Sequence, residues 1–233
     1  MRNILATYLG LTDYKTIWDY QRELHSLRSA NIIPDVLLLN EHRHVYTLGK
    51  GSDENHLLAN EDFLKSTGAE VYHIDRGGDI TYHGPGQLVG YPILNLGNYY
   101  KDIHRYLRDI EEVIIRVLND FDLKGEREPG FTGVWVKGEK IAAIGVKVSR
   151  WITMHGFAFN INTDLKYFDS IIPCGIFHKG VTSLQQLIGK DMPLEEVAKI
   201  LINRFGDVFN AEMEVCSPEI ILNMKRQLTM ENH

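Results

Sequence analysis

The stretch GVWVKGEKIAAIGVKVSRWITMHGFAFNI, residues 133–161, decides the fold class. It contains three apolar runs, at residues 133–136, 141–149 and 154–161, which are separated by short polar links. Within the last run Phe157, Phe159 and Ile161 recur at every second position, which is the period of a strand. Because links this short join neighbouring strands, the pattern predicts a meander of three antiparallel strands.

Helices and further strands are expected on either side of this meander. Residues 102–121 show the clearest helical pattern, because apolar side chains recur there every three or four positions. A second amphipathic helix is expected over residues 13–30, and strands over residues 36–39 and 45–48. Thr182 with Gln185 predicts a capping box, and Pro193 suits the first turn of a further helix. Antiparallel strands with separated helices predict an α+β fold.

The chain shows no boundary between two large domains. It has no repeat, no low-complexity tract and no linker rich in serine and proline. We expect residues 1–215 to form one catalytic domain. Residues 216–233, in which Ser217 and Pro218 open a short helix, are expected to form a helical tail of the same domain.

Composition excludes several classes of function. The 233 residues carry 25 Lys and Arg against 31 Asp and Glu, a formal charge of −6, which argues against nucleic-acid binding. The two cysteines, Cys174 and Cys216, are too few and too far apart for a zinc knuckle or a disulfide framework. No secretory signal or apolar membrane span is visible. A reducing, cytoplasmic compartment is the expectation.

The segment RGGDITYHGPGQ, residues 76–87, is poor core material and a candidate binding loop. Its four glycines let a ligand approach the backbone closely, and Arg76, Asp79 and His83 supply polar contacts. An ordinary surface turn is the alternative. The segment lacks the third glycine of the dinucleotide fingerprint, and residues 49–52 lack the spacing of a phosphate loop.

Cys174, between Pro173 and Gly175, is a candidate nucleophile, although a lone cysteine is more often an inert apolar residue. At pH 7 a thiol of ordinary pKa is only a few per cent thiolate, so a nucleophilic cysteine needs a cation or a base beside it. Spacing leaves several candidates open, which are Lys137, Lys140, Lys147, Lys179, His83, His155 and His178. Motifs of metalloproteases and serine esterases are absent, so no metal site is expected.

Three blocks together resemble the lipoyl(octanoyl) transferase family. They are RGGDITYHGPGQLVGYPI from Arg76, KIAAIGVKVSRWITMHGFAFNIN from Lys140, and IIPCGI around Cys174. The resemblance implies a biotin/lipoate protein ligase-like fold with a mixed, largely antiparallel sheet flanked by helices. It also implies an acyltransferase that carries octanoyl groups from octanoyl-acyl carrier protein to a lysine of a lipoyl domain. Implied acceptors are the lipoyl domains of 2-oxoacid dehydrogenases and glycine cleavage protein H.

The same resemblance assigns residues to the site and implies no cofactor. Cys174 would form an acyl-thioester, and Lys140 would favour its thiolate by placing a positive charge nearby. The implied substrate-binding residues are Arg76, Gly77, Gly78, Asp79, Ile80, Thr81, Tyr82, His83, Ala143, Ile144, Gly145, Gly156, Phe157 and Ala158. Two alternatives remain, an ATP-dependent lipoate-protein ligase on the same fold and a non-catalytic module that binds acyl chains.

Overall fold

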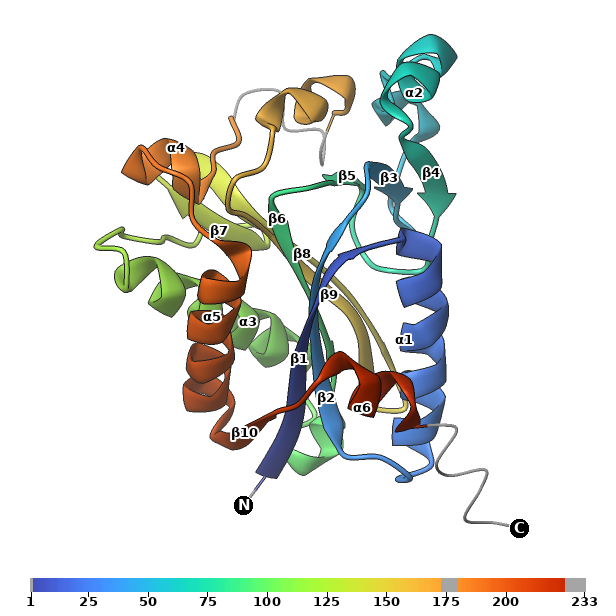
Figure 1. Ribbon diagram of the computed structural model, residues 1–233, viewed down its shortest axis with the longest axis vertical. Helices are drawn as coiled ribbons and strands as arrows, with labels where there is room; N and C mark the ends of the chain where they lie inside the picture. Colours follow the sequence, from blue (N-terminus) through green and yellow to red (C-terminus); the bar gives the residue numbers. More distant parts are fainter. Residues whose placement is uncertain (1, 173–179, 225–233) are drawn as a thin grey trace.

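The computed structural model describes residues 2–172 and 180–224, in which a large sheet has helices on both faces (Figure 1). The strand order in this sheet is β10-β1-β2-β6-β9-β8-β7. Its members are β1 (Arg2–Thr12), β2 (Asp35–His42), β6 (Gln87–Ile93), β7 (Gly133–Val136), β8 (Glu139–Ser149), β9 (Ile152–Asn160) and β10 (Ala211–Val215). β1 is parallel to β10 and to β2, and the other neighbours are antiparallel. The α+β fold with a mixed, largely antiparallel sheet is therefore confirmed.

Each face of the large sheet is covered by its own helices. α1 (Tyr14–Ser29) and α6 (Pro218–Leu222) cover one face, and α3 (Ile103–Asn119) and α5 (Leu194–Phe209) cover the other (Figure 1). Side chains of β1 alternate between the two cores, because Ile4 packs toward α3 and α5 and Leu5 toward α1. A strand buried on both faces has apolar residues at every position. That explains the continuous apolar run in β2.

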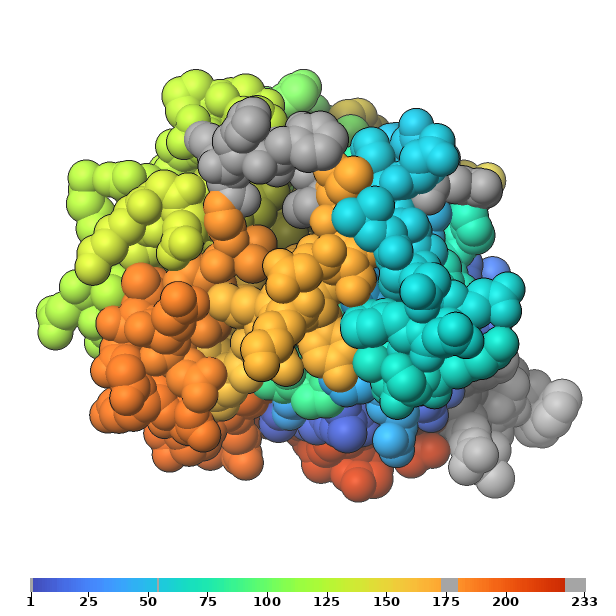
Figure 2. Space-filling view, turned by 90° about the horizontal axis from the view of Figure 1, so that it is seen from above, coloured from blue at the N-terminus to red at the C-terminus, as the bar shows by residue number. Residues whose placement is uncertain are grey.

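A smaller sheet of order β4-β3-β5 lies at one end of the large one (Figure 1). It consists of β3 (Val45–Leu48), β4 (Glu70–His73) and β5 (Ile80–His83), with α2 (Glu61–Thr67) beside it. Near this end lie α4 (Leu184–Ile188) and the 3-10 helices η1 (Glu54–His56) and η3 (Leu165–Ser170), and Figure 2 shows this end from above. A further 3-10 helix, η2 (Leu96–Asn98), precedes α3.

The meander predicted from residues 133–161 is confirmed as β7, β8 and β9, and the helices predicted over residues 13–30 and 102–121 are α1 and α3. The capping box predicted at Thr182 is wrong. Ser183 is the N-cap of α4 and its side chain accepts a hydrogen bond from the backbone N–H of Gln186. The N–H of Gln185 instead donates to the carbonyl oxygen of Ile161, 2.8 Å away, so the start of α4 is joined to the end of β9.

Two kinds of feature are absent from the described residues. Within 2–172 and 180–224 no helix is long and apolar enough to cross a membrane. The same residues contain no cluster of three or more His, Cys, Asp or Glu side chains that could bind a metal ion.

Candidate active site

A cavity of about 480 Å³ lies between the loop that precedes β5 and the strands β8 and β9. Of the predicted substrate-binding residues it is lined by Arg76, Gly77, Gly78, Asp79, Ile80, Thr81, His83, Ala143, Ile144, Gly145, Gly156, Phe157 and Ala158. Lys140 lines it as well. Residues from three separate parts of the chain are thus brought to one hollow.

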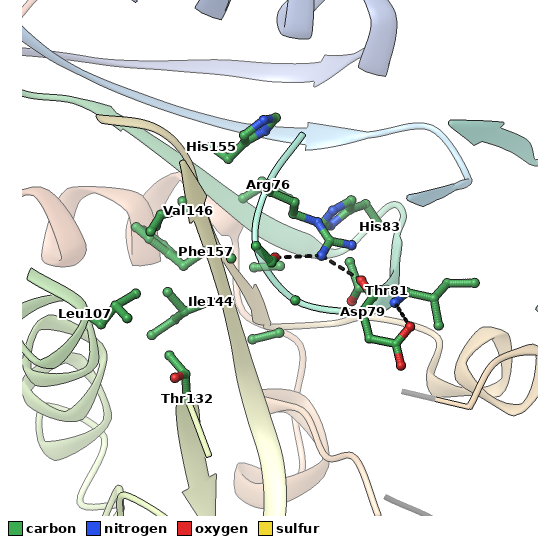
Figure 3. A pocket seen from close by; sticks show the side chains of 18 of the residues that line it. Arg76, Asp79, Thr81, His83, Leu107, Thr132, Ile144, Val146, His155 and Phe157 are labelled. Carbon is green, nitrogen blue, oxygen red and sulfur yellow. Dashed lines mark hydrogen bonds between the residues drawn. The ribbon is translucent and has the colours of Figure 1, made fainter. Parts of the chain in front are cut away.

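One side of the cavity is apolar and the other is polar. Figure 3 shows Leu107, Ile144, Val146 and Phe157 together on one side, and Arg76, Asp79, Thr81 and His83 on the other. An apolar hollow with a few placed polar groups is the usual form of a small-molecule site. The arrangement suits a ligand with an apolar chain and a polar head.

Small residues on β8 and β9 line the hollow and let neighbouring backbone approach closely. Ala143 lies opposite Ala158, and Gly145 lies opposite Gly156. Residues two apart on a strand share a face, so these four small side chains lie together on one face of the hairpin. A Cβ atom at Gly145 would lie 2.9 Å from the carbonyl oxygen of Gly77, so the binding loop packs directly on this face.

Arg76 organises the binding loop from inside. Its side chain is only 7% exposed, and its guanidinium donates to the carbonyl oxygens of Thr47 and Asp79, each at 2.7 Å. Asp79 in turn accepts from the backbone N–H of Ile80 and lies 2.6 Å from Nδ1 of His56. Buried charges are stable only when they are paired or hydrogen-bonded. Both predicted polar residues therefore also have structural partners in the loop.

Three histidines lie near the cavity, and burial lowers the pKa of each. Burial lowers the pKa of His83 to about 4 and that of His42 to about 3, so both rings are neutral at pH 7. His155 lines the cavity, and burial lowers its pKa also, although Asp75 opposes this. Asp75 accepts from His155 and Lys147, and the bond with His155 contributes most to holding the pKa of Asp75 well below its usual range.

Lys140 lies in β8 and lines the hollow. Its Nζ is 5.0 Å from the ring centroid of the buried Trp135, a distance at which a cation interacts with an aromatic face. Gly133, at φ +145°, leaves room for this side chain, because a Cβ atom there would lie 2.9 Å from Cε of Lys140. The backbone N–H of Lys140 donates to the carbonyl oxygen of Gly180 at 2.9 Å.

Cys174, the predicted nucleophile, lies outside the described residues, as do Lys179 and His178. The described residues on both sides of this gap border the site. Ile172 donates its backbone N–H to the carbonyl oxygen of His56 at 2.8 Å. On the other side Val181 lines the cavity and forms a parallel bridge with Lys140.

Tyr82 does not line the cavity. Its ring stacks on Tyr167 with centroids 4.9 Å apart, and its hydroxyl lies 2.7 Å from Nδ1 of His44. Thr81 and His83 line the hollow, whereas Tyr82 packs in the core of the small sheet with Ile80, which also lines the cavity.

Several cavity-lining residues were not predicted from the sequence. Tyr14 of α1, Val89 and Tyr91 of β6 and Leu107 of α3 all line the cavity. Each lies in an apolar pattern that predicts core packing, so no local signal distinguishes it. Asp75, which directly precedes the binding loop, could have been considered as a partner for His155.

Comparison with known proteins agrees with this fold. The family model "Lipoyl protein ligase A/B catalytic domain" matches residues 13–206. Lipoate-protein ligase A bound with ATP has a TM-score of 0.77 at 17% identity, covering 99% of this chain and 95% of that one. Biotin protein ligase from Aquifex aeolicus, in complex with biotin and ATP, has a TM-score of 0.53 at 13% identity, covering 90% of this chain and 71% of that one. At such identities the likeness shows the fold, which is that of the lipoate and biotin protein ligases.

The chain belongs to the lipoyl protein ligase A/B catalytic domain family. An octanoyltransferase of Christiangramia forsetii is 51% identical over 223 residues, covering 88% of this chain and 95% of that protein. An octanoyltransferase of Rubrobacter xylanophilus is 55% identical over 201 residues, covering 85% and 90%. Within the family the chain is therefore a member of the octanoyltransferases, and it is an acyltransferase.

Proposed function

We propose that this enzyme transfers an octanoyl group from an acyl carrier protein to a lysine of a lipoyl domain through a thioester on Cys174. The observation that supports this most directly is similarity to octanoyltransferases at about half identity over nearly the whole length. The apolar hollow beside the binding loop suits an acyl chain, because each buried CH₂ contributes about 0.8 kcal/mol. The family implies acyl-carrier donors and lipoyl-domain acceptors in general.

The chemistry would proceed in two exchanges. The Cys174 thiolate attacks the thioester carbonyl of the donor, a bond forms between its sulfur and the acyl carbon, the carrier S–C bond breaks, and the carrier leaves as a thiolate that takes a proton from solvent. The neutral amine of the acceptor lysine then attacks the new thioester, the C–N bond of the amide forms as the Cys174 S–C bond breaks, the amine gives up one proton to solvent, and the Cys174 thiolate is released. Exchange between thioesters is nearly isoenergetic and formation of the amide is downhill, so the sequence of steps requires no nucleotide.

The position of Lys140 supports its assignment as the cation beside this thiolate. The chain that bears Cys174 begins two residues earlier at Ile172, which bonds to His56, and returns at Gly180, which bonds to Lys140 itself. An adjacent ammonium favours the charged form of a thiol and lowers its pKa. Gly180 and Val181, which follow the Cys174 segment in sequence, pair with the backbone of Lys140, the residue that bears the amine.

Mass spectrometry of the intact protein tests the thioester. After incubation with octanoyl-acyl carrier protein and no ATP, we expect one octanoyl adduct on the wild type and none on Cys174→Ala. Cys216→Ala is the matched control, because Cys216 lies beside Ala6 at the edge of the sheet farthest from β7 and β8, and burial raises its pKa. An adduct that persists in Cys174→Ala, or transfer that needs ATP and free acid, would contradict the proposal and favour the ligase alternative. Binding of the donor without any adduct would favour a non-catalytic module.

Substitution of Lys140 separates two roles for its amine. Lys140→Arg keeps a positive charge but cannot give up a proton at ordinary pH. If Lys140 also acts as a base on the acceptor lysine, we expect the variant to form the thioester yet transfer it to the lipoyl domain at least ten-fold more slowly. Single-turnover measurement of each half-reaction distinguishes the steps. Full transfer by Lys140→Arg would rule out the base role and leave the electrostatic one.

A further inference from the structure

Two buried amides connect the polar wall of the cavity to Lys140. Gln87 and Asn160 are opposite each other in the ladder between β6 and β9, and they are 1% and 4% exposed. The Nε2 of Gln87 donates to Oδ1 of Asn160 at 2.9 Å and to the carbonyl oxygen of Tyr82 at 3.2 Å. The Oε1 of Gln87 lies 2.8 Å from Nδ1 of His83, and Nδ2 of Asn160 donates to the carbonyl oxygen of Thr182 at 3.0 Å.

Two backbone carbonyls determine the direction of every bond in this network. A carbonyl oxygen only accepts, so Asn160 must present its NH₂ group to Thr182 and its oxygen to Gln87. Gln87 therefore presents its NH₂ group to that oxygen and to the carbonyl of Tyr82. Its remaining oxygen faces His83 and can only accept. It follows that Nδ1 of His83 carries a hydrogen.

This tautomer leaves Nε2 of His83 as a hydrogen-bond acceptor. A neutral imidazole has one N–H, and burial keeps His83 neutral at pH 7. Among the described residues, none forms a hydrogen bond with Nε2, and the ring lines the cavity beside Arg76 (Figure 3). The ring plane is fixed by Tyr14, which stacks on it at 6.1 Å, and by the edge of His42 at 6.0 Å.

The other end of the network reaches the backbone of Lys140. Thr182 donates its N–H to the carbonyl oxygen of Lys140 at 3.0 Å, and Lys140 donates its N–H to Gly180 at 2.9 Å. Asn160 contacts the same strip through the carbonyl of Thr182. The strip 180–182 is thus bonded to Lys140 on one side and to Asn160 on the other.

We propose that Gln87 and Asn160 are positioning residues of the acyl transfer, which orient His83 as an acceptor for an N–H group of a substrate and clamp strip 180–182 against Lys140. The N–H group belongs either to the arm of the acyl carrier or to the amine of the acceptor lysine. The role in transfer rests on the proposed function, whereas the tautomer of His83 does not.

Nitrogen-15 NMR of histidine-labelled protein tests the tautomer directly. We expect His83, whose signals disappear in His83→Gln, to be protonated at Nδ1 in the wild type. Gln87→Met removes the acceptor oxygen and should shift the ring toward the Nε2–H form. A wild-type ring protonated at Nε2 would overturn the proposal, whether or not either variant folds.

Steady-state kinetics tests the two ends of the network separately. Gln87→Met should raise KM about 3- to 10-fold for the substrate that supplies the N–H, the size of one neutral hydrogen bond. The donor and the lipoyl domain are varied in turn, so the substrate whose KM responds is identified. Unchanged KM for both substrates would contradict the role of His83.

Asn160→Leu should lower kcat at least ten-fold, since strip 180–182 loses its clamp. Asn162→Leu is the matched control, because Asn162 bonds to Met192 instead and is not linked to His83 or Lys140. Equal kcat in the two variants would refute the clamp. If instead Cys174→Ala still transfers octanoyl groups, the proposed function fails while the NMR result stands.

Discussion

Two regions of the same sheet, the pair β1–β2 and the hairpin β8–β9, use their side chains differently. In β2 the four residues Val36, Leu37, Leu38 and Leu39 are fully buried and alternate between the two cores. In the hairpin the facing pairs are Ala143 with Ala158 and Gly145 with Gly156. One region fills its space with large apolar groups, and the other carries small residues that line the cavity and let neighbouring backbone approach closely.

The difference shows where this fold gains stability and where it gives stability up. Burial of one CH₂ group stabilises a fold by about 0.8 kcal/mol, so the small side chains of the hairpin contribute less to stability than the large ones of β1–β2. The ladder between β8 and β9 nonetheless continues from Ala142 to Ser149, because backbone hydrogen bonds do not depend on side-chain size. Substitutions in β1–β2 should therefore change stability, and substitutions on the small-residue face of the hairpin should change substrate choice.

The largest expected effect is on stability, in the filled region. Leu38→Ala should lower the free energy of unfolding by about 2–5 kcal/mol, because Leu38 is fully buried and its loss leaves a cavity. Urea denaturation measures this. Leu11→Ala in β1 is the control, since Leu11 is 50% exposed and its truncation should cost well under 1 kcal/mol. If both variants lose the same free energy of unfolding, burial of Leu38 does not contribute the expected stability.

His42, at the end of β2, predicts a pH dependence of stability. Its ring is buried against His83, Tyr14 and Tyr91, and its pKa is lowered to about 3, against about 6.5 when unfolded. Below pH 6.5 the unfolded state binds a proton that the folded state does not, so stability falls as the pH falls. Between pH 6.5 and 4.5 this loss is about 2–3 kcal/mol.

His42→Gln should remove that part of the slope, and denaturation at several pH values measures it. His104→Gln is the control, because His104 is exposed on α3. If the wild type and His42→Gln lose stability in parallel, His42 is not the group responsible.

Chain-length preference should change in the hollow region. Ala143→Val places two extra methyl groups at the cavity wall, so we expect weaker use of the octanoyl donor and relatively better use of shorter acyl chains. The change should be about four-fold for each CH₂ excluded, measured as kcat/KM over a series of acyl donors. Ala142→Val is the matched control. Ala142 faces the core beneath α3, so overpacking there should cost about 1–3 kcal/mol of stability with the chain-length preference unchanged.

The smallest expected effect concerns Asp75, which is bonded to His155 and Lys147 at the margin of the hollow. Because its pKa is depressed in the fold, its contribution to stability is present above its unfolded pKa of about 3.9 and is lost as the pH falls through the lower folded value. Asp75 is partly exposed, so Asp75→Asn should cost about 1 kcal/mol or less near pH 7. The melting temperatures of the wild type and of Asp75→Asn should converge below pH 4. A difference in melting temperature that stays constant down to pH 2 would show that the substitution acts through packing and not through charge.

Local patterns in the sequence predicted the meander, α1, α3 and the α+β class, because these elements have an apolar period of their own. The binding loop was also visible locally, since four glycines and a histidine within twelve residues are unsuitable for a core. The resemblance to a known family added the roles of Cys174 and Lys140, which spacing had left open.

Other features were decided only by tertiary structure. β1 and β10 were not predicted as strands, because their parallel pairing joins residues more than 200 positions apart and leaves no local period. The side chain of Tyr82 stacks on Tyr167 and does not line the cavity, whereas Tyr91 lines it because β6 lies beside β9. The tautomer of His83 depends on carbonyl groups of Tyr82 and Thr182, one adjacent and one a hundred residues away. A sequence records which groups are available, but hydrogen-bond direction is a property of groups already brought into contact.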